Sequence, residues 1–548
     1  MTLPLSYASG TSTTPLLGET IDANLRRAVA RVPDREALVD VAGGRRYTYA
    51  ELDAAIDRVA AGLLARGVGR GDRVGIWAPN CAEWFLTQYA TARIGAILVN
   101  INPAYRTHEL EYVLRQAAIG TLVSATAFKT SDYRAMVEQV RGGLDALREV
   151  VYLGGESWAA LLAAGAGIDG EQIAARSAVL HFDDPINIQY TSGTTGFPKG
   201  ATLSHHNILN NGYFVGEGMG YCEQDRICVP VPFYHCFGMV MGNLASTSHG
   251  ACVVIPAPGF DPAATLAAVQ DERCTSLYGV PTMFIAELGL PDFADYDLSS
   301  LRTGCMAGSP CPVEVMKRVI AEMHMAEVTI CYGMTETSPV STQTSKDDSL
   351  DRRTATVGRV HPHVEVMVVD PETNLPVPCG EPGELCTRAY SVMLGYWDEP
   401  GQTAEVLRNG WMHTGDLATM DAEGYVTIVG RIKDMVIRGG ENVYPREIEE
   451  FLYTHPDVVD AQVIGVPDVK YGEELMAWVR LREGATPLTA DALREFCEGS
   501  LAHYKIPRYV HVVDEFPMTV TGKVRKVEMR ARAVELLGLQ DAADTAQV

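Results

Sequence analysis

Residues Tyr190 to Ser204 read Tyr-Thr-Ser-Gly-Thr-Thr-Gly-Phe-Pro-Lys-Gly-Ala-Thr-Leu-Ser and follow an apolar, strand-like run from Ile186. The first ten positions after Tyr190 hold three glycines, four hydroxyl side chains and one lysine. Glycines let backbone N–H groups approach an oxyanion, hydroxyls add donors, and Lys199 adds a point charge. The spacing differs from a Walker A motif, because Gly200 follows the lysine where Ser or Thr would hold magnesium. We interpret the stretch as a phosphate-binding loop, although its composition alone leaves a surface turn open.

Length and charge restrict what the whole chain can do. At 548 residues it is too long for one core and is expected to form at least two domains. The net charge of −24 disfavours nucleic acid as a partner. No run of eighteen apolar residues occurs, so no transmembrane segment is expected, and the first residues do not resemble a secretion signal. Twelve cysteines without a C-x-x-C pattern indicate reduced thiols and a cytoplasmic protein.

Helix and strand signals alternate through the first 360 residues. Thr48 and Glu51 form a capping box ahead of an apolar helical pattern that Gly67 ends. Residues 72–80 predict a short strand and turn, 82–94 a helix and 97–101 a strand. Further strands are expected at 122–124, 150–153, 252–255, 276–278 and 328–331. This alternation predicts an α/β fold with a largely parallel sheet.

The pattern of helix and strand signals changes twice towards the C-terminus. Past about residue 360 alternating strands with Pro- and Gly-rich turns predict a β-rich subdomain. From Asp434 onwards a separate α+β pattern begins, with a helix starting at Pro445 and another from Thr489 to about Leu501. We therefore expect a large domain over residues 1–430, a hinge at 431–434 and a small mobile domain over 435–548.

The string from Thr191 to Gly200 resembles the phosphate-loop motif of the adenylate-forming, AMP-producing ligases. This superfamily includes acyl-CoA synthetases, peptide-synthetase adenylation domains and firefly luciferase. Five later segments match it: Pro232 to Met239, Ala307 to Pro310, Tyr332 to Glu336, His413 to Leu417 together with Arg431, and Pro517 to Lys523. The resemblance covers nearly all of the chain, and two further segments, Asn100 to Arg106 and Gly439 to Pro445, look most like fatty-acyl-CoA synthetases of the medium-chain subgroup.

The resemblance implies a set of ATP-binding residues: Thr191, Ser192, Gly193, Thr194, Thr195, Gly196, Lys199, Gly308, Ser309, Pro310, Tyr332, Gly333, Thr335, Asp416 and Arg431. Within it, Tyr332 is expected to stack on adenine. Asp416 is expected to accept hydrogen bonds from both ribose hydroxyls, since a carboxylate offers two acceptor oxygens to a cis-diol. Glu336 follows a strand end, where ligands bind in open α/β sheets, and is implied to hold Mg²⁺.

Besides Glu336, two more residues are implied to be catalytic. Lys523 would meet the substrate carboxylate and the α-phosphate, and His235 would lie between the acyl pocket and the phosphates. Gly238 and Met239 would line the acyl tunnel. Peptide-synthetase domains carry an aspartate near here for the substrate amino group, and none occurs between residues 230 and 243, which argues against an amino acid substrate.

Thioester formation needs a thiol where Lys523 would stand. By the resemblance, the small domain rotates about Lys433 and brings a CoA-binding loop to the site, with Gly439, Gly440 and Glu441 along it. The two glycines suit a loop that lets the narrow pantetheine arm pass close to backbone.

These observations predict a fatty-acid–CoA ligase that uses ATP, CoA and Mg²⁺ and forms an acyl-adenylate. Two rival enzymes stay open: a fatty-acyl-AMP ligase that loads a carrier protein, and a CoA ligase for aryl or other carboxylic acids. A non-catalytic nucleotide-binding regulator is disfavoured, since a pure binder has no use for a mobile lysine. Peripheral membrane contact stays open, as does the choice between monomer and homodimer.

Overall fold

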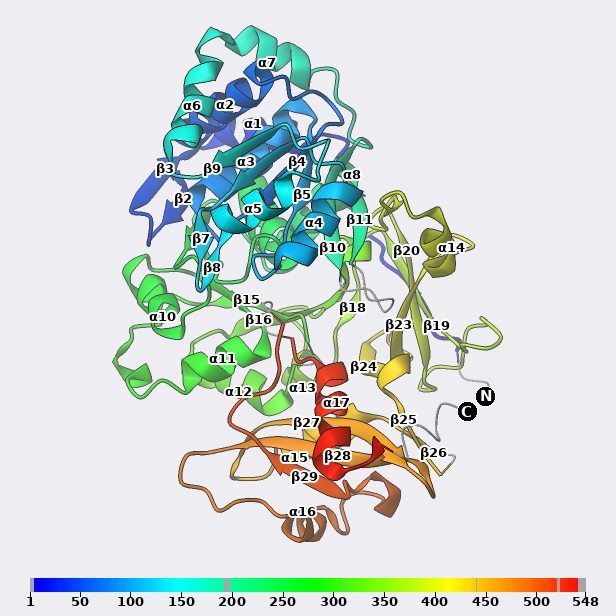
Figure 1. The fold of residues 1–548 in the computed structure, drawn as a ribbon. Helices are drawn as coiled ribbons and strands as arrows, with labels where there is room; N and C mark the ends of the chain where they lie inside the picture. The colour runs from blue at the N-terminus through cyan, green and yellow to red at the C-terminus, as the bar shows by residue number, and fades with distance from the viewer. Residues whose placement is uncertain (1–3, 192–197, 310, 440, 520–522, 541–548) are drawn as a thin grey trace.

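The computed structural model describes residues 4–191, 198–309, 311–439, 441–519 and 523–540 (Figure 1). Helices and sheets are mixed throughout, and two large sheets with helices around them are built from the first 360 residues, apart from one short edge strand at Gly395–Tyr396 (Figure 1). The predicted α/β class is therefore confirmed. Among the described residues, none of the helices has the length and apolar content to cross a bilayer.

The first large sheet has seven strands in the order β21-β11-β10-β5-β4-β6-β9. Its strands are β4 (Arg73–Trp77), β5 (Ile97–Asn100), β6 (Thr121–Ser124), β9 (Glu149–Tyr152), β10 (Pro185–Thr191), β11 (Lys199–Ser204) and β21 (Gly395–Tyr396). The strands from β10 to β9 in this order run parallel, while β10 and β11 are antiparallel. The predicted phosphate loop therefore connects two neighbouring antiparallel strands.

The second large sheet has nine strands in the order β18-β17-β16-β15-β14-β12-β13-β2-β3. They are β2 (Glu36–Asp40), β3 (Arg45–Thr48), β12 (Arg226–Cys228), β13 (Cys252–Ile255), β14 (Ser276–Gly279), β15 (Thr303–Ala307), β16 (Glu327–Gly333), β17 (Val340–Gln343) and β18 (Arg359–Val360). The six strands from β16 to β2 are parallel, so their carboxyl ends share one edge. Tyr332 and Gly333 lie at this edge.

Helices pack between and around these sheets. Their bounds are α1 (Ile21–Arg31), α2 (Tyr49–Ala65), α3 (Ala82–Ile94), α4 (Thr107–Gln116), α5 (Tyr133–Arg141), α6 (Glu156–Ala164), α7 (Gly170–Ser177), α8 (His205–Gly218), α9 (Ala245–His249), α10 (Pro262–Asp271), α11 (Pro281–Leu288), α12 (Val313–Glu322) and α13 (Leu350–Ala355). The capping box predicted at Thr48 and Glu51 begins α2. All thirteen residues of α3 are buried, and the main core combines side chains of α3 with those of both sheets, so α3 lies between them.

A third sheet forms the β-rich part that the sequence predicts after residue 360. It contains β1 (Tyr7–Ser9), β19 (Val364–Val369), β20 (Gly383–Ala389), β22 (Leu407–Arg408), β23 (Trp411–Met420) and β24 (Val426–Arg431), with α14 (Pro400–Val406) beside it. Strand β1 pairs with β19, so the N-terminal stretch belongs to a sheet built more than 350 residues later.

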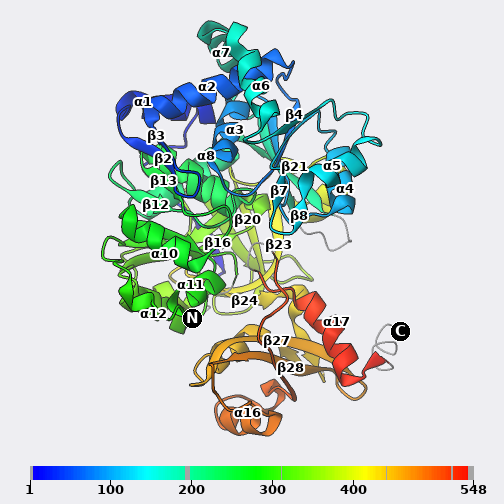
Figure 2. The same cartoon turned by 60° about the vertical axis from the view of Figure 1, so that its left-hand side comes forward.

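The last sheet and its helices lie below the others in Figure 1 and Figure 2. They are β25 (Val436–Arg438), β26 (Glu441–Val443), β27 (Val458–Asp468), β28 (Gly472–Leu481), β29 (Tyr509–Val512), α15 (Pro445–Leu452), α16 (Ala490–Cys497) and α17 (Lys526–Leu537). The sequence predicts that the helix of α16 continues to about Leu501. It ends at Cys497, because Gly499 takes a left-handed φ of 79°.

The predicted hinge falls on a single turn. Residues Ile432–Asp434 form the 3-10 turn η5, between the last strand of the third sheet and the first strand of the small sheet. The division into domains that move about this turn stays a prediction. In the structure, the segment before α17 runs up from the small sheet to the ends of β15 and β16 (Figure 1). Lys523, in the segment before α17, thereby lines a pocket together with His235 and Gly308, which precede the small sheet in the sequence.

Candidate active site

The ends of the predicted phosphate loop are in place. Thr191 ends β10, Lys199 begins β11, and the two residues are paired across the strands. The ammonium group of Lys199 lies 5.2 Å from the ring centre of Tyr396, which is close enough for a cation–π contact. The loop residues Ser192, Gly193, Thr194, Thr195 and Gly196, and also Pro310 and Gly440, lie outside the described residues, so these assignments stay predictions.

Glu336 is the acidic residue beside this loop. It lies in the short turn η4 (Thr335–Thr337) after β16 and is only 5% exposed. Its Oε1 accepts hydrogen bonds from the hydroxyls of Tyr396, at 2.8 Å, and Thr191, at 3.4 Å. No described residue donates a hydrogen bond to its Oε2. A carboxylate oxygen without a donor among the described residues, on a side chain that contacts Thr191 at the start of the predicted phosphate loop, fits the preference of Mg²⁺ for carboxylate and phosphate ligands.

Both carboxylate oxygens of Asp416, the residue predicted to bind the ribose, accept hydrogen bonds. The Tyr332 hydroxyl donates to Oδ2 of Asp416 at 2.7 Å, and Nε of Arg431 donates to Oδ1 at 3.2 Å. Burial, and next the charge of Asp416, raise the pKa of Tyr332, so it remains a hydrogen-bond donor. Three predicted ATP-binding residues from two different sheets thus meet at one carboxylate.

A small pocket brings together the two other predicted catalytic residues. Its lining consists of Val231, Pro232, His235, Phe237, Val280, Gly308 and Lys523. Burial and the nearby Lys523 lower the pKa of His235 to about 3, so its imidazole is neutral at physiological pH. Burial, and next Arg431, lower the pKa of Lys523. The pocket therefore places a positively charged group from the C-terminal part beside the predicted acyl and phosphate positions.

Gly308 lines the same pocket. Its φ of 91° suits glycine, and a Cβ added there would lie 3.8 Å from Cε of Lys523 and 3.1 Å from Val280. Ser309 follows it at the carboxyl end of β15. Gly333 is more tightly restricted by its neighbours, because an added Cβ would lie 1.8 Å from the carbonyl oxygen of Pro339. The predicted adenine-flanking segments are thus closely packed backbone.

The predicted acyl-tunnel residues belong to a buried π-helix, η2 (Phe237–Leu244). A Cβ on Gly238 would lie 2.4 Å from the carbonyl oxygen of Pro232, so only glycine fits there. The sulfur of Met239 accepts hydrogen bonds from the side-chain amides of Asn100, at 3.1 Å, and Gln189, at 3.2 Å. Gly238 and Met239 directly follow Phe237, which lines the pocket, but neither is among the residues that line it. Their contact with an acyl chain stays a prediction.

Thr335 is buried beside the pocket, and its hydroxyl lies 3.7 Å from the sulfur of Cys236.

The predicted CoA loop is not brought to the site. Gly439 and Glu441 flank the turn between β25 and β26, which lie at the right-hand end of the small sheet in Figure 1. Gly439 has a φ of 61°, and its N–H donates to the carbonyl oxygen of Tyr471 at 2.8 Å.

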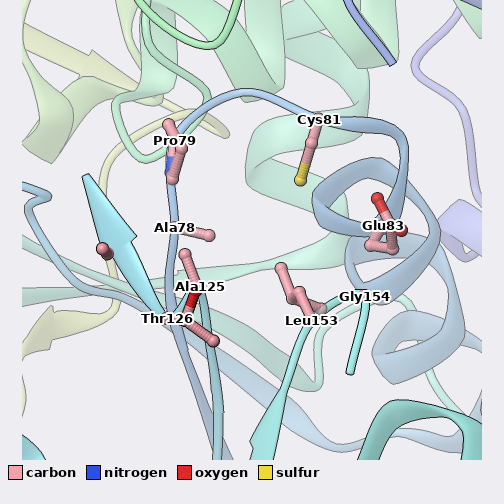
Figure 3. Close-up of a pocket in the computed structure, with 9 residues that line it drawn as sticks. Ala78, Pro79, Cys81, Glu83, Ala125, Thr126, Leu153 and Gly154 are labelled. Carbon is pink, nitrogen blue, oxygen red and sulfur yellow. The ribbon is translucent and has the colours of Figure 1, made fainter. Parts of the chain in front are cut away.

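A larger pocket of about 240 Å³ lies elsewhere, beyond the carboxyl ends of β4, β6 and β9. Its lining is Ala78, Pro79, Cys81, Glu83, Ala125, Thr126, Ala127, Leu153 and Gly154, and Figure 3 shows the sulfur of Cys81 near its rim. Burial raises the pKa of Cys81 to about 12. A thiol held protonated is a weak nucleophile, and none of the predicted site residues lines this pocket.

Sequence reasoning missed Tyr396, although it holds Glu336 and faces Lys199. The tyrosine reaches the site because β21 pairs with β11. No local sequence pattern predicts that β21 pairs with β11, so only the tertiary structure could identify Tyr396 as a site residue.

Comparison with known proteins agrees with this geometry. Residues 25–397 match the family model described as AMP-binding enzyme, and residues 447–523 match the AMP-binding enzyme C-terminal domain. The putative acyl-CoA synthetase YngI of Bacillus subtilis (strain 168) is 47% identical over 96% of this chain and 99% of its own length. The mitochondrial medium-chain acyl-CoA ligase ACSF2 of Danio rerio is 46% identical over 98% of this chain and 92% of its own length.

A solved structure supports the same relationship. The anthranilate CoA ligase AuaEII in complex with anthranoyl-AMP superposes with a TM-score of 0.84 at 28% identity. The alignment covers 95% of this chain and 98% of that one.

Proposed function

The chain belongs to the family of AMP-binding enzymes and is an AMP-forming ligase of the acyl-CoA synthetase type, and from this premise we propose that it joins medium- to long-chain fatty acids to CoA. The observation that carries the proposal is the 46% sequence identity, over 98% of this chain, to a relative named a medium-chain acyl-CoA ligase. The pocket shared by His235 and Lys523 supports it, since an acyl carboxylate needs a positive charge beside it during activation.

The proposed first step activates the acid. A carboxylate oxygen attacks the α-phosphorus of ATP, the bond to the bridging oxygen breaks, and diphosphate leaves with the bonding electrons. In our proposal Lys523 and Lys199 stabilise the charge on the phosphates, while Asp416 and Tyr332 hold the ribose. Glu336 would hold Mg²⁺, which when bound neutralises phosphate charge. The product is an acyl-adenylate, whose AMP is a far better leaving group than oxide.

The proposed second step transfers the acyl group. The sulfur of CoA attacks the carbonyl carbon, AMP leaves, and the thiol proton is released. Lys523 occupies the pocket in this structure, whereas the loop that includes Gly439 and Glu441 lies away from it. We propose that rotation about Lys433 exchanges the two between the half-reactions.

The main alternative is a CoA ligase for aryl acids, because the structurally similar AuaEII is named an anthranilate CoA ligase. A fatty-acyl-AMP ligase that loads a carrier protein is the other. For the cell compartment we propose the cytoplasm, because all twelve cysteines are free thiols. The ACSF2 relatives are named mitochondrial, so imaging of the tagged chain is the deciding measurement.

The experiment is diphosphate release from ATP with straight-chain acids of graded length and with anthranilate, each with and without CoA. We expect release that CoA stimulates and that peaks at a medium or long chain. A peak at anthranilate would establish the aryl ligase, and acid-dependent release that CoA leaves unchanged would establish the acyl-AMP ligase. Removing Mg²⁺ with a chelator should stop release and adding it back should restore it, with Glu336→Gln requiring more Mg²⁺ for half-maximal rate.

A further inference from the structure

Glu384 is a buried acidic residue that the reaction described above does not use. It lies on β20, opposite β23, and its side chain is 11% exposed. Its Oε2 lies 2.8 Å from Nδ1 of His413, and its Oε1 accepts a 3.0 Å hydrogen bond from the N–H of Gly415. Both oxygens of one buried carboxylate therefore hold the segment that leads directly into Asp416.

That segment needs holding, because it bulges out of the strand. Cys386 pairs with His413 and Glu384 pairs with Leu417, so Leu385 alone faces three residues of β23. Gly415 takes a left-handed φ of 72° within this bulge. The Thr414 hydroxyl donates to the carbonyl oxygen of Leu385 at 2.6 Å and accepts from the N–H of Asp416 at 3.1 Å.

We infer that Glu384 is a positioning residue for nucleotide binding: through His413 and Gly415 it fixes the bulge that aims the Asp416 carboxylate at the ribose of ATP. The inference rests on the proposed ribose contact of Asp416. Without Glu384, the bulge would lose two of its four side-chain hydrogen bonds across the strands: the N–H of Gly415 would be left unpaired, and Nδ1 of His413 would keep only the 3.4 Å contact with the sulfur of Cys386. Asp416 would then lose the alignment that it shares with Tyr332 and Arg431.

A metal ion is the competing reading of the same side chains. Glu384, Cys386 and His413 offer ligand atoms that all lie within 4.8 Å of one another. Two ligands at bond lengths of 2.0–2.2 Å around a tetrahedral ion lie roughly 3.3 Å or more apart. The observed 2.8 Å between Nδ1 and Oε2 is instead a hydrogen-bond distance, and Oε1 is occupied by Gly415. The geometry favours positioning.

The test compares nucleotides that carry or lack the group that Asp416 would bind. Dissociation constants for ATP, 2′-deoxyATP and 3′-deoxyATP are measured by calorimetry for the wild type and for Glu384→Ala, Glu384→Gln and Asp416→Asn. The matched control is Glu365→Gln, which removes an exposed ion pair with Arg388 on the neighbouring strand of the same sheet. Thermal midpoints are recorded for each variant, and Glu384→Gln carries the test if the alanine variant does not fold.

We expect Glu384→Ala to weaken ATP binding about tenfold to hundredfold and to weaken binding of the deoxynucleotides far less, so that the preference for ATP shrinks as it does in Asp416→Asn. Glu384→Gln, which retains an acceptor for Gly415, should lie in between. Equal weakening for all three nucleotides would overturn the inference, as would a wild type that does not prefer ATP, or a stoichiometric metal that the Glu384 variants lose. Binding is measured without acid, so absent diphosphate release would overturn the proposed ligase activity alone.

Discussion

The hydroxyl of Tyr332 donates a 2.7 Å hydrogen bond to the carboxylate of Asp416, and this bond joins the nine-stranded sheet to the third sheet at the proposed nucleotide site. Sequence reasoning gave each residue a separate role, adenine stacking for one and ribose binding for the other. The structure shows that they also contact each other, so a change at Tyr332 should affect ribose recognition.

Tyr332→Phe tests this coupling. The ring remains for stacking, but Asp416 loses a donor, so we expect the KM for ATP to rise about five- to thirtyfold, as for the loss of about 1–2 kcal/mol. Turnover at saturating ATP should change little. Steady-state kinetics of diphosphate release with ATP varied provides the measurement. An unchanged KM would mean that water or Arg431 orients Asp416 equally well.

Lys523→Ala should separate the two half-reactions. Loss of one charge-stabilising group typically costs a hundred- to thousandfold in rate, so adenylation should fall by about that factor. Conversion of a supplied acyl-adenylate to acyl-CoA should fall far less, because in the proposed rotation Lys523 leaves the site before that step. Single-turnover assays of each half-reaction measure this, with Lys526→Ala on the nearby α17 as a control for general damage. A similar loss in both half-reactions would contradict the assignment.

The same lysine predicts a pH dependence. Burial, and next Arg431, lower the pKa of Lys523, and the charged ammonium is the form that stabilises phosphate charge. The ammonium is populated below its pKa, so adenylation should decline as pH rises, starting below the ordinary lysine pKa of about 10.4. The thioester half-reaction should lack this alkaline decline. A pH profile of each half-reaction checks this, and identical profiles would exclude Lys523 as the titrating group.

Local signals in the sequence predicted the elements well. The capping box of Thr48 and Glu51 begins α2, and the strand after Thr275 and the helix starting at Pro445 both occur as expected. These features depend on neighbouring residues, so a single stretch of sequence contains the whole signal. The adenylate-forming motifs likewise identified residues that meet in space, such as Tyr332, Asp416 and Arg431.

Long-range contacts between single residues were not predictable in this way. Glu336 and Tyr396 are 60 positions apart, and they meet because β21 pairs with β11. Glu384 and His413 are 29 positions apart and meet because β20 pairs with β23. The polar, extended N-terminal stretch also gave no sign that Tyr7–Ser9 would pair with β19. A strand partner depends on the whole fold, and a lone tyrosine or glutamate has no local pattern that reveals its partner.

Lys433→Pro tests the proposed hinge. Lys433 lies in the 3-10 turn η5, and the φ that is typical of such turns, about −50 to −70°, is compatible with proline. Proline would fix this φ and so restrict rotation of the chain at residue 433. We expect thioester formation to slow much more than adenylation. Lys433→Ala, which retains backbone freedom, is the matched control and should keep both rates near wild type. Equal slowing of the two half-reactions in the proline variant would argue against a hinge at this position.

Buried histidines predict how stability responds to acid. Burial lowers the pKa of His205 to about 4, and its Nδ1 accepts a hydrogen bond from the N–H of Ile21 at 3.2 Å. Between about pH 6.5 and pH 4 the unfolded chain binds a proton that the folded chain does not, so stability falls as pH falls through this window. A shift of this size corresponds to about 3 kcal/mol once the pH is below the folded pKa. His205→Asn keeps an acceptor for Ile21 and cannot titrate. Urea midpoints at pH 7.5 and pH 5.0 should therefore differ less in His205→Asn than in the wild type, and an equal difference would show that other groups carry the acid sensitivity.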